Sequence, residues 1–174
     1  MSEFTNENID INALCGFENL DFKPINRRYL NVRRLKFIIL FVIILIAMNI
    51  IALTAIDFPY VYSLIPIVFV FLIFISIILI LPKAHKKRAF ALRENDITYK
   101  SGLIWHSIIT IPLNRVQHVA VTEGPVTRMY KLKNLNLYTS GESSSDLVIK
   151  GLTKEQAFKI KDFINSRLEK YENQ

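Results

Sequence analysis

Three polar side chains that could carry chemistry lie close together in the second half of the chain. Arg115, Gln117 and His118 stand between Pro112 and Gly124, next to or within residues 116–122, whose apolar and polar side chains alternate as in a β-strand. On such a strand Arg115 and Gln117 share one face, and His118 lies on the other face with Val116. This arrangement predicts either a recognition patch for a lipid headgroup or a partner protein, or structural residues that bond to neighbouring strands.

Other kinds of reactive site find little support in the composition. A catalytic histidine needs an orienting acid and a nucleophile, and the spacing around His118 offers no such set. A single cysteine excludes an internal disulfide framework, and three scattered histidines do not suggest a zinc module. Five glycines and no GxxxxGK[ST] motif argue against a phosphate-binding loop. We therefore expect a non-enzymatic protein with no catalytic residue, metal or cofactor.

A few further residues admit two interpretations. Gly124, Pro125 and Gly141 are expected to form turns, with a place in an interaction patch as the alternative. Arg128, with Lys131 and Lys133, predicts a basic loop, which is either a phosphoinositide site or solvated surface charge. Trp105 is either an anchor at a lipid interface or part of a core.

Two apolar segments determine where all these residues lie relative to a membrane. Residues 37–56 and 61–81 contain no charged side chain, and only residues 57–60 join them. Each segment would form a helix of roughly 30 Å, about the thickness of a bilayer hydrocarbon core. Core helices of soluble proteins keep a polar stripe, which these segments lack. The sequence therefore predicts a transmembrane helical hairpin.

Basic residues flank this hairpin on both sides. Since positive charge is retained in the cytoplasm, both termini are expected there, in a two-pass protein of a bacterial inner membrane. Nine cations in these flanks exceed the formal net charge of +7, so the basicity lies at the membrane surface and does not indicate nucleic-acid binding. The expected lipid-surface contacts are Arg27, Arg28, Arg33, Arg34, Lys36, Lys83, Lys86, Lys87 and Arg88.

The chain divides into three parts by composition. Residues 1–26 form an acidic arm, residues 27–88 hold the hairpin with its basic flanks, and residues 89–174 form a cytoplasmic domain. In that domain turn signals separate short β-rich runs, and Thr153 with Gln156 fits a capping box before an amphipathic helix. The helix must bury its apolar stripe against the sheet. The strands are expected at residues 88–92, 97–100, 105–111, 116–122, 135–139 and 146–149.

The order of these features resembles the bacterial pleckstrin-homology-domain membrane proteins of the YdbS-like type. The similarity runs from about residue 20 to 164, and the run Ile111-Pro-Leu-Asn-Arg-Val-Gln-His-Val is its most specific part. Further matching runs begin at Phe90, Glu123 and Leu135. The chain departs from the pattern at four loop or turn positions: Glu123 for Gln, Lys131 for Gly, Ser140 for Ala and Lys150 for Pro.

The resemblance implies a pleckstrin-homology-like fold, in which two antiparallel sheets form a sandwich or partial barrel capped by the C-terminal helix. It also implies a non-enzymatic membrane protein that assembles with itself or with a larger relative carrying several such domains. Two functions follow as hypotheses: an interaction module held at the membrane, or a protein that binds or handles anionic membrane lipids.

Overall fold

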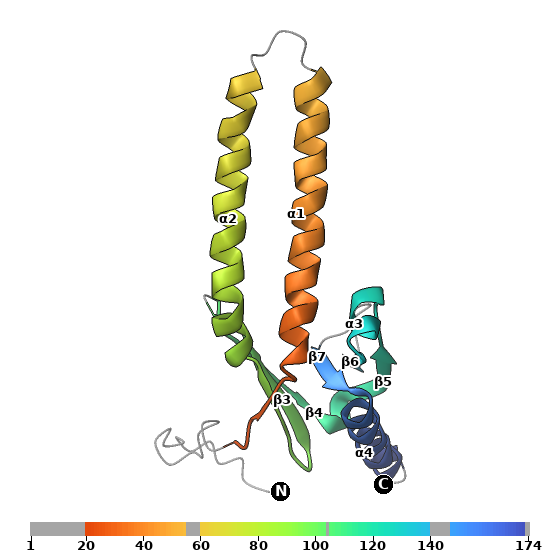
Figure 1. Ribbon diagram of the computed structural model, residues 1–174. Helices are drawn as coiled ribbons and strands as arrows, with labels where there is room; N and C mark the ends of the chain where they lie inside the picture. Colours follow the sequence, from red (N-terminus) through yellow and green to blue (C-terminus); the bar gives the residue numbers. More distant parts are fainter. Residues whose placement is uncertain (1–19, 55–59, 104, 140–146, 173–174) are drawn as a thin grey trace, which may run out of the picture.

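Two long antiparallel helices stand on a small β-rich body (Figure 1). The computed structural model describes residues 20–54, 60–103, 105–139 and 147–172. Helices α1 (Arg28–Thr54) and α2 (Tyr60–Lys86) lie side by side, and the ring of Phe41 stacks on that of Phe74 with centroids 4.1 Å apart. Their apolar side chains mostly point outward, and both helices are long and apolar enough to cross a membrane. The predicted hairpin is confirmed, whereas residues 57–59 of its link lie outside the described residues.

Both helices extend beyond the apolar segments into the basic flanks. The side chain of Asn26 caps the start of α1, because its Oδ1 accepts a 2.9 Å hydrogen bond from the backbone N–H of Arg28. Helix α2 continues through Pro82 to Lys86. Most of the flanking cations therefore stand on helical turns, which fixes the face on which each one lies.

The body contains two antiparallel sheets within the described residues. The first has the order β1-β2-β3-β4, and the second has the order β5-β6-β7. The first sheet comprises β1 (Lys23–Pro24), β2 (Ala89–Leu92), β3 (Asp96–Ser101) and β4 (Ser107–Pro112). The second comprises β5 (Val116–Thr122), β6 (Leu132–Thr139) and β7 (Leu147–Thr153).

One hydrophobic core joins the two sheets to the C-terminal helix α4 (Lys154–Glu172). Ile97 from the first sheet and Leu135 from the second are fully buried in it, and Ile164 of α4 is fully buried there as well. The capping box at the start of α4 is confirmed. The backbone N–H of Gln156 donates to Thr153 Oγ1 at 3.2 Å, and the backbone N–H of Thr153 donates to Gln156 Oε1 at 3.1 Å.

Several elements differ from the expectation. The N-terminal arm does not stay separate up to residue 26, because Lys23 and Pro24 pair with Phe90 and Ala89 and Ile25 is only 4% exposed. Two short helices were not predicted, η3 (Leu113–Arg115) and α3 (Pro125–Met129). Strand β7 also continues past its expected end to Thr153, with Gly151 as the extra residue of a bulge between the pairs Lys133–Leu152 and Asn134–Lys150.

Gly151 connects the body to the first turn of α1. Its φ of +82° is favourable only for glycine, and a Cβ there would lie 2.6 Å from Cγ of Tyr29 and 2.7 Å from Cγ2 of Ile25. Tyr29 and Val32 of α1 are themselves buried in the core of the body. The base of the hairpin is thus part of that core.

Replacing Gly151 with alanine should therefore destabilise the protein by about 2 kcal/mol or more, through backbone strain and overpacking. Thermal unfolding of the full chain in mild detergent measures this. Gly124→Ala is the matched control, because the nearest atom to a Cβ there is 3.8 Å away and the backbone is unstrained. Equal stability of the two variants would contradict the close contact.

Candidate functional site

The base of α1, Arg88 shortly after α2 and Lys150 of β7 form a site rich in positive charge. Tyr29, Arg33, Lys36, Phe37 and Leu40 follow one another at spacings of three, four or one along α1, and so occupy one face of the helix. Burial of Tyr29 against Gly151 turns this face toward β7 and the end of α2. Packing of the first helical turn therefore determines where the cations point.

This face lines an open cavity of about 330 Å³. Four of its lining residues carry a positive charge, and among the described residues that line it there is no aspartate or glutamate. Phe37 and Leu40 line the side from which the apolar segment of α1 continues. The lining residues are Tyr29, Arg33, Lys36, Phe37, Leu40, Arg88 and Lys150.

Two guanidinium groups in this cavity have buried N–H groups without a partner. Nη1 of Arg33 and Nε of Arg88 are inaccessible to solvent and have no hydrogen-bond acceptor among the described residues. Arg88 does donate from Nη1 to the hydroxyl of Tyr99, at 3.2 Å. Buried donors that lack an acceptor are costly, and like charges in the same partly buried place repel each other.

His85 lies close to this cavity, next to Tyr29. Its side chain is buried, its Nδ1 has no partner among the described residues, and its ring lies 6.4 Å from that of Tyr29. The two arginines together form a cluster of donors with a shortage of acceptors. An anionic group in the cavity would accept from the N–H groups of these arginines that line it and would offset their mutual repulsion. Arginine suits such a group because its donors form a planar fork.

A larger cavity of about 440 Å³ lies between β2, α4 and the segment before β1. Its lining carries charges of both signs, with Asp21 beside Lys23, Arg93 and Lys159. It therefore lacks the single-signed lining of the site around Arg33 and Arg88.

The predicted patch around His118 is arranged differently from the expectation. The pairing of β5 with β6 shifts between Val116 and His118, which indicates a β-bulge at this point. As a result Val116 and Val119 are buried, while Gln117 and His118 are both exposed. The expectation that Val116 and His118 share a face is therefore wrong.

Arg115 lies at the end of η3, before the strand, and is exposed. The ring of His118 stacks on Tyr138, with centroids 4.1 Å apart and an interplanar angle of 14°. Whether Arg115, Gln117 and His118 recognise a partner stays a prediction.

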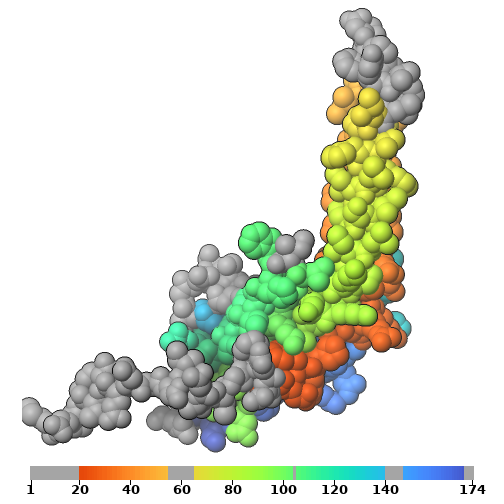
Figure 2. Space-filling view, turned by 90° about the vertical axis from the view of Figure 1, so that its left-hand side faces the viewer, coloured from red at the N-terminus to blue at the C-terminus, as the bar shows by residue number. Residues whose placement is uncertain are grey.

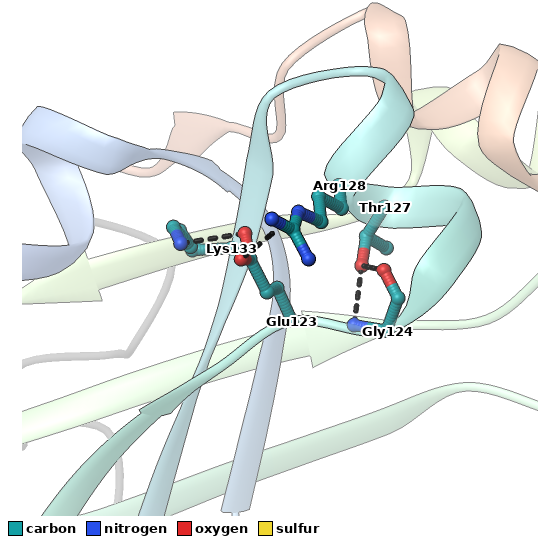
Figure 3. A network of polar contacts seen from close by, with 5 residues as sticks. All are labelled: Glu123, Gly124, Thr127, Arg128 and Lys133. Carbon is teal, nitrogen blue, oxygen red and sulfur yellow. Dashed lines mark hydrogen bonds and ion pairs between the residues drawn. The ribbon is translucent and has the colours of Figure 1, made fainter.

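The predicted basic loop is also not a loop (Figure 3). Arg128 belongs to α3, Lys131 has a φ of +56° at the turn, and Lys133 belongs to β6. The Glu123 carboxylate accepts a hydrogen bond from Lys133 Nζ at 2.5 Å, and its Oε1 lies 4.0 Å from Nε of Arg128. The hydrogen bond from Lys133 holds the pKa of Glu123 below its usual range. Two of the three expected cations are therefore partly neutralised.

Gly124 and Pro125 start α3, as shown beside the same network (Figure 3). The Thr127 hydroxyl accepts a 2.7 Å hydrogen bond from the backbone N–H of Gly124 and donates to the Gly124 carbonyl at 2.8 Å. These two residues begin a short helix and do not simply form a turn. Gly141 lies outside the described residues.

Trp105 is 87% exposed, so the alternative that places it in the core is contradicted. It precedes β4 instead of lying in it, because that strand begins at Ser107.

Three of the nine expected lipid-surface residues line the cavity: Arg33, Lys36 and Arg88. Sequence reasoning missed Tyr29 and Lys150. Tyr29 could have been found by extending α1 back from the apolar segment, since it lies one turn before Arg33. For Lys150 the signal was its replacement of the proline common in the resembling family. The remaining flanking cations stand around the same end of the hairpin and are at least partly exposed: Arg27, Arg28, Arg34, Lys83, Lys86 and Lys87.

Comparison with known proteins gives three similarities. The family model for the bacterial PH domain matches residues 30–168. The UPF0699 transmembrane protein YdbS of Bacillus subtilis (strain 168) is 30% identical over 89 residues, covering 51% of this chain and 54% of that protein. A crystal structure of a DUF1696 family protein with a pleckstrin-homology domain from Shewanella loihica PV-4 covers 47% of this chain and 70% of its own chain, with 20% identity and a TM-score of 0.36. The chain thus matches about half the length of its curated relative.

The unpartnered donors lead to a stability prediction. In neutral detergent without added lipid, Arg33→Met should stabilise the full chain by about 1 kcal/mol, because it removes a partly buried charge and keeps an apolar stem. Thermal unfolding measures the change. Lys170→Met at the exposed end of α4 removes one positive charge elsewhere and should have almost no effect. A clear loss of stability in the Arg33 variant would mean that the charge already has a partner.

Proposed function

Because this chain belongs to the bacterial PH domain family, we propose that it is a membrane protein whose PH-like body binds an anionic lipid headgroup at the base of its hairpin. The observation that carries the proposal is the cavity around Arg33 and Arg88, where buried donors lack acceptors beside an apolar surface. A phospholipid has the matching chemistry, with phosphate oxygens for the arginines and acyl chains for Phe37 and Leu40.

The proposed topology has two passes with both termini in the cytoplasm of a bacterium. The two helices of the hairpin end in basic residues on the side of the body, which the positive-inside rule assigns to the cytoplasm. In this topology the body of residues 89–174, together with β1 and Ile25, lies against the inner leaflet. That leaflet carries anionic lipids, and each nearby cation gains on the order of 1 kcal/mol.

The proposed role requires no bond to be made or broken. The family members matched here carry no stated activity in their names, and the site has the features of a binding site: fixed donors, an open cavity and a neighbouring apolar wall. We propose a non-enzymatic protein without a cofactor.

A second candidate function is assembly with another copy of the chain or with a larger PH-domain membrane protein. The observation that favours it is the free edge of the first sheet, where β4 pairs with β3 on one side only among the described strands. Ile108 on this edge is 47% exposed. An edge strand of this kind can accept a strand from a partner.

Lipid binding predicts a selective thermal shift. Phosphatidylglycerol added to the detergent-solubilised full chain should raise the unfolding temperature more than phosphatidylcholine, since ligand at 100 times its Kd adds about 2.7 kcal/mol. In the Arg33→Gln/Arg88→Gln variant the affinity should fall about tenfold or more, a loss of about 1.4 kcal/mol. The lipid-induced shift should also shrink as salt rises.

The matched control is Arg27→Gln/Arg28→Gln, which removes two exposed cations from the same end of the hairpin without touching the cavity. It should keep most of the shift. Equal losses in the two double variants would indicate diffuse attraction to the basic flanks, and equal shifts with both lipids would reject the proposal.

Assembly through the edge predicts a change of mass. Ile108→Lys places a charge on β4, which natural proteins use to prevent strand addition at an edge. If β4 is the interface, the full chain in detergent should change from an oligomer to a monomer in light scattering, whereas Ile108→Val should remain an oligomer. A wild-type protein that is already monomeric would rule out self-assembly at this edge.

A further inference from the structure

Two strongly exposed apolar side chains of the body stand at the end from which the helices rise. Outside α1 and α2, Trp105 at 87% and Met129 at 72% are the most exposed large apolar side chains among the described residues. A single exposed apolar residue is ordinary on a protein surface. Their common position at one end of the body is what requires an explanation.

The register of the first sheet sets the position of Trp105. Ala89, the residue where β2 leaves the end of α2, pairs with Lys100, and Ser101 pairs with Ser107. The connection between β3 and β4 therefore extends past the end of α2, back in the direction from which the helix comes. Gly102 makes this turn possible with a φ of +105°, since a Cβ there would lie 1.7 Å from the carbonyl oxygen of Trp105.

Helix α3 brings Met129 to the same end by a different route. It follows β5 and stands beside the base of α1 (Figure 1). In Figure 1 the β3–β4 connection and α3 reach a similar height on opposite sides of the two helices. In the space-filling view turned by 90°, the green part of the chain that holds the first sheet also projects upward beside the lower ends of the two helices (Figure 2).

The apolar segments of the hairpin indicate what lies at this height. In α2 the apolar run ends at Leu81 and is followed by Pro82 and Lys83, so the bilayer boundary falls near these residues. The β3–β4 connection extends back alongside this part of α2. Tryptophan favours such a boundary because its ring has an apolar body and one polar N–H.

We propose that the body is seated on the bilayer by two interfacial contacts, Trp105 on one side of the hairpin and Met129 of α3 on the other. The partner surface is the lipid interface itself, into which both side chains insert at headgroup depth. Together with the hairpin these contacts hold the body at three points and prevent it from tilting. The seating does not depend on the charge of the headgroups, so it is separate from the binding of an anionic lipid around Arg33.

Trp105 is the only tryptophan of the chain, so its fluorescence reports on the contact without labelling. We expect the full chain in nanodiscs of zwitterionic phosphatidylcholine to show blue-shifted emission that brominated acyl chains quench and aqueous iodide quenches little. Emission typical of water, quenched by iodide and insensitive to bromolipids, would overturn the proposal for Trp105.

Two variants test the remaining parts. In Trp105→Phe/Met129→Trp the new tryptophan on α3 should also be quenched by bromolipids, and a solvent-exposed signal would refute the second contact. In Trp105→Phe/Phe158→Trp the tryptophan lies on α4, on the side of the body away from the spans, and should be quenched by iodide instead (Figure 1). Bromolipid quenching of that control would show that the body is not seated as proposed.

These outcomes separate the two proposals. Quenching of Trp105 in zwitterionic bilayers, combined with no selective stabilisation by phosphatidylglycerol, would support the seating and reject the headgroup site. An exposed Trp105 combined with selective stabilisation would do the reverse.

Discussion

The central constraint at the foot of the apolar hairpin is a crowded set of positive charges with too few hydrogen-bond acceptors. Arg33 and Arg88 lie in one cavity with Lys36 and Lys150, and buried N–H groups of both arginines have no acceptor among the described residues. In a protein alone this arrangement costs free energy through desolvation and repulsion. In the proposed function an anion in the cavity offsets this repulsion, and the surface of a bilayer offers phosphate groups at that level.

The same few residues couple the hairpin to the body. Tyr29 and Val32 are helical residues of α1 and also members of the core, and Gly151 allows β7 to approach Tyr29 closely. The packing of the body therefore fixes the positions of the basic residues at the start of α1. In the proposed function this coupling lets a β-rich body present a defined site at a membrane surface, where a flexible linker would only supply diffuse charge.

Much of the architecture could be predicted from the sequence because its signals are local. Uncharged runs give the hairpin, and Thr153 with Gln156 gives the start of α4. The candidate site was harder to predict from the sequence, because its residues come together only through tertiary contacts. The bulge near Gln117 exposes His118 against the simple alternation, and a bulge has no reliable sequence signal when no glycine marks it. Pairing of Lys23 and Pro24 with β2 joins residues far apart in the sequence, and Lys150 reaches the cavity only through the fold of the second sheet.

The most direct test of the central claim is native mass spectrometry of the full chain, extracted from bacterial membranes in mild detergent. The account predicts that one anionic phospholipid stays bound to each wild-type chain and is lost from the Arg33→Gln/Arg88→Gln variant under the same activation energy. A wild-type chain that carries no lipid, or that retains zwitterionic and anionic lipids in the proportions of the membrane, would contradict it.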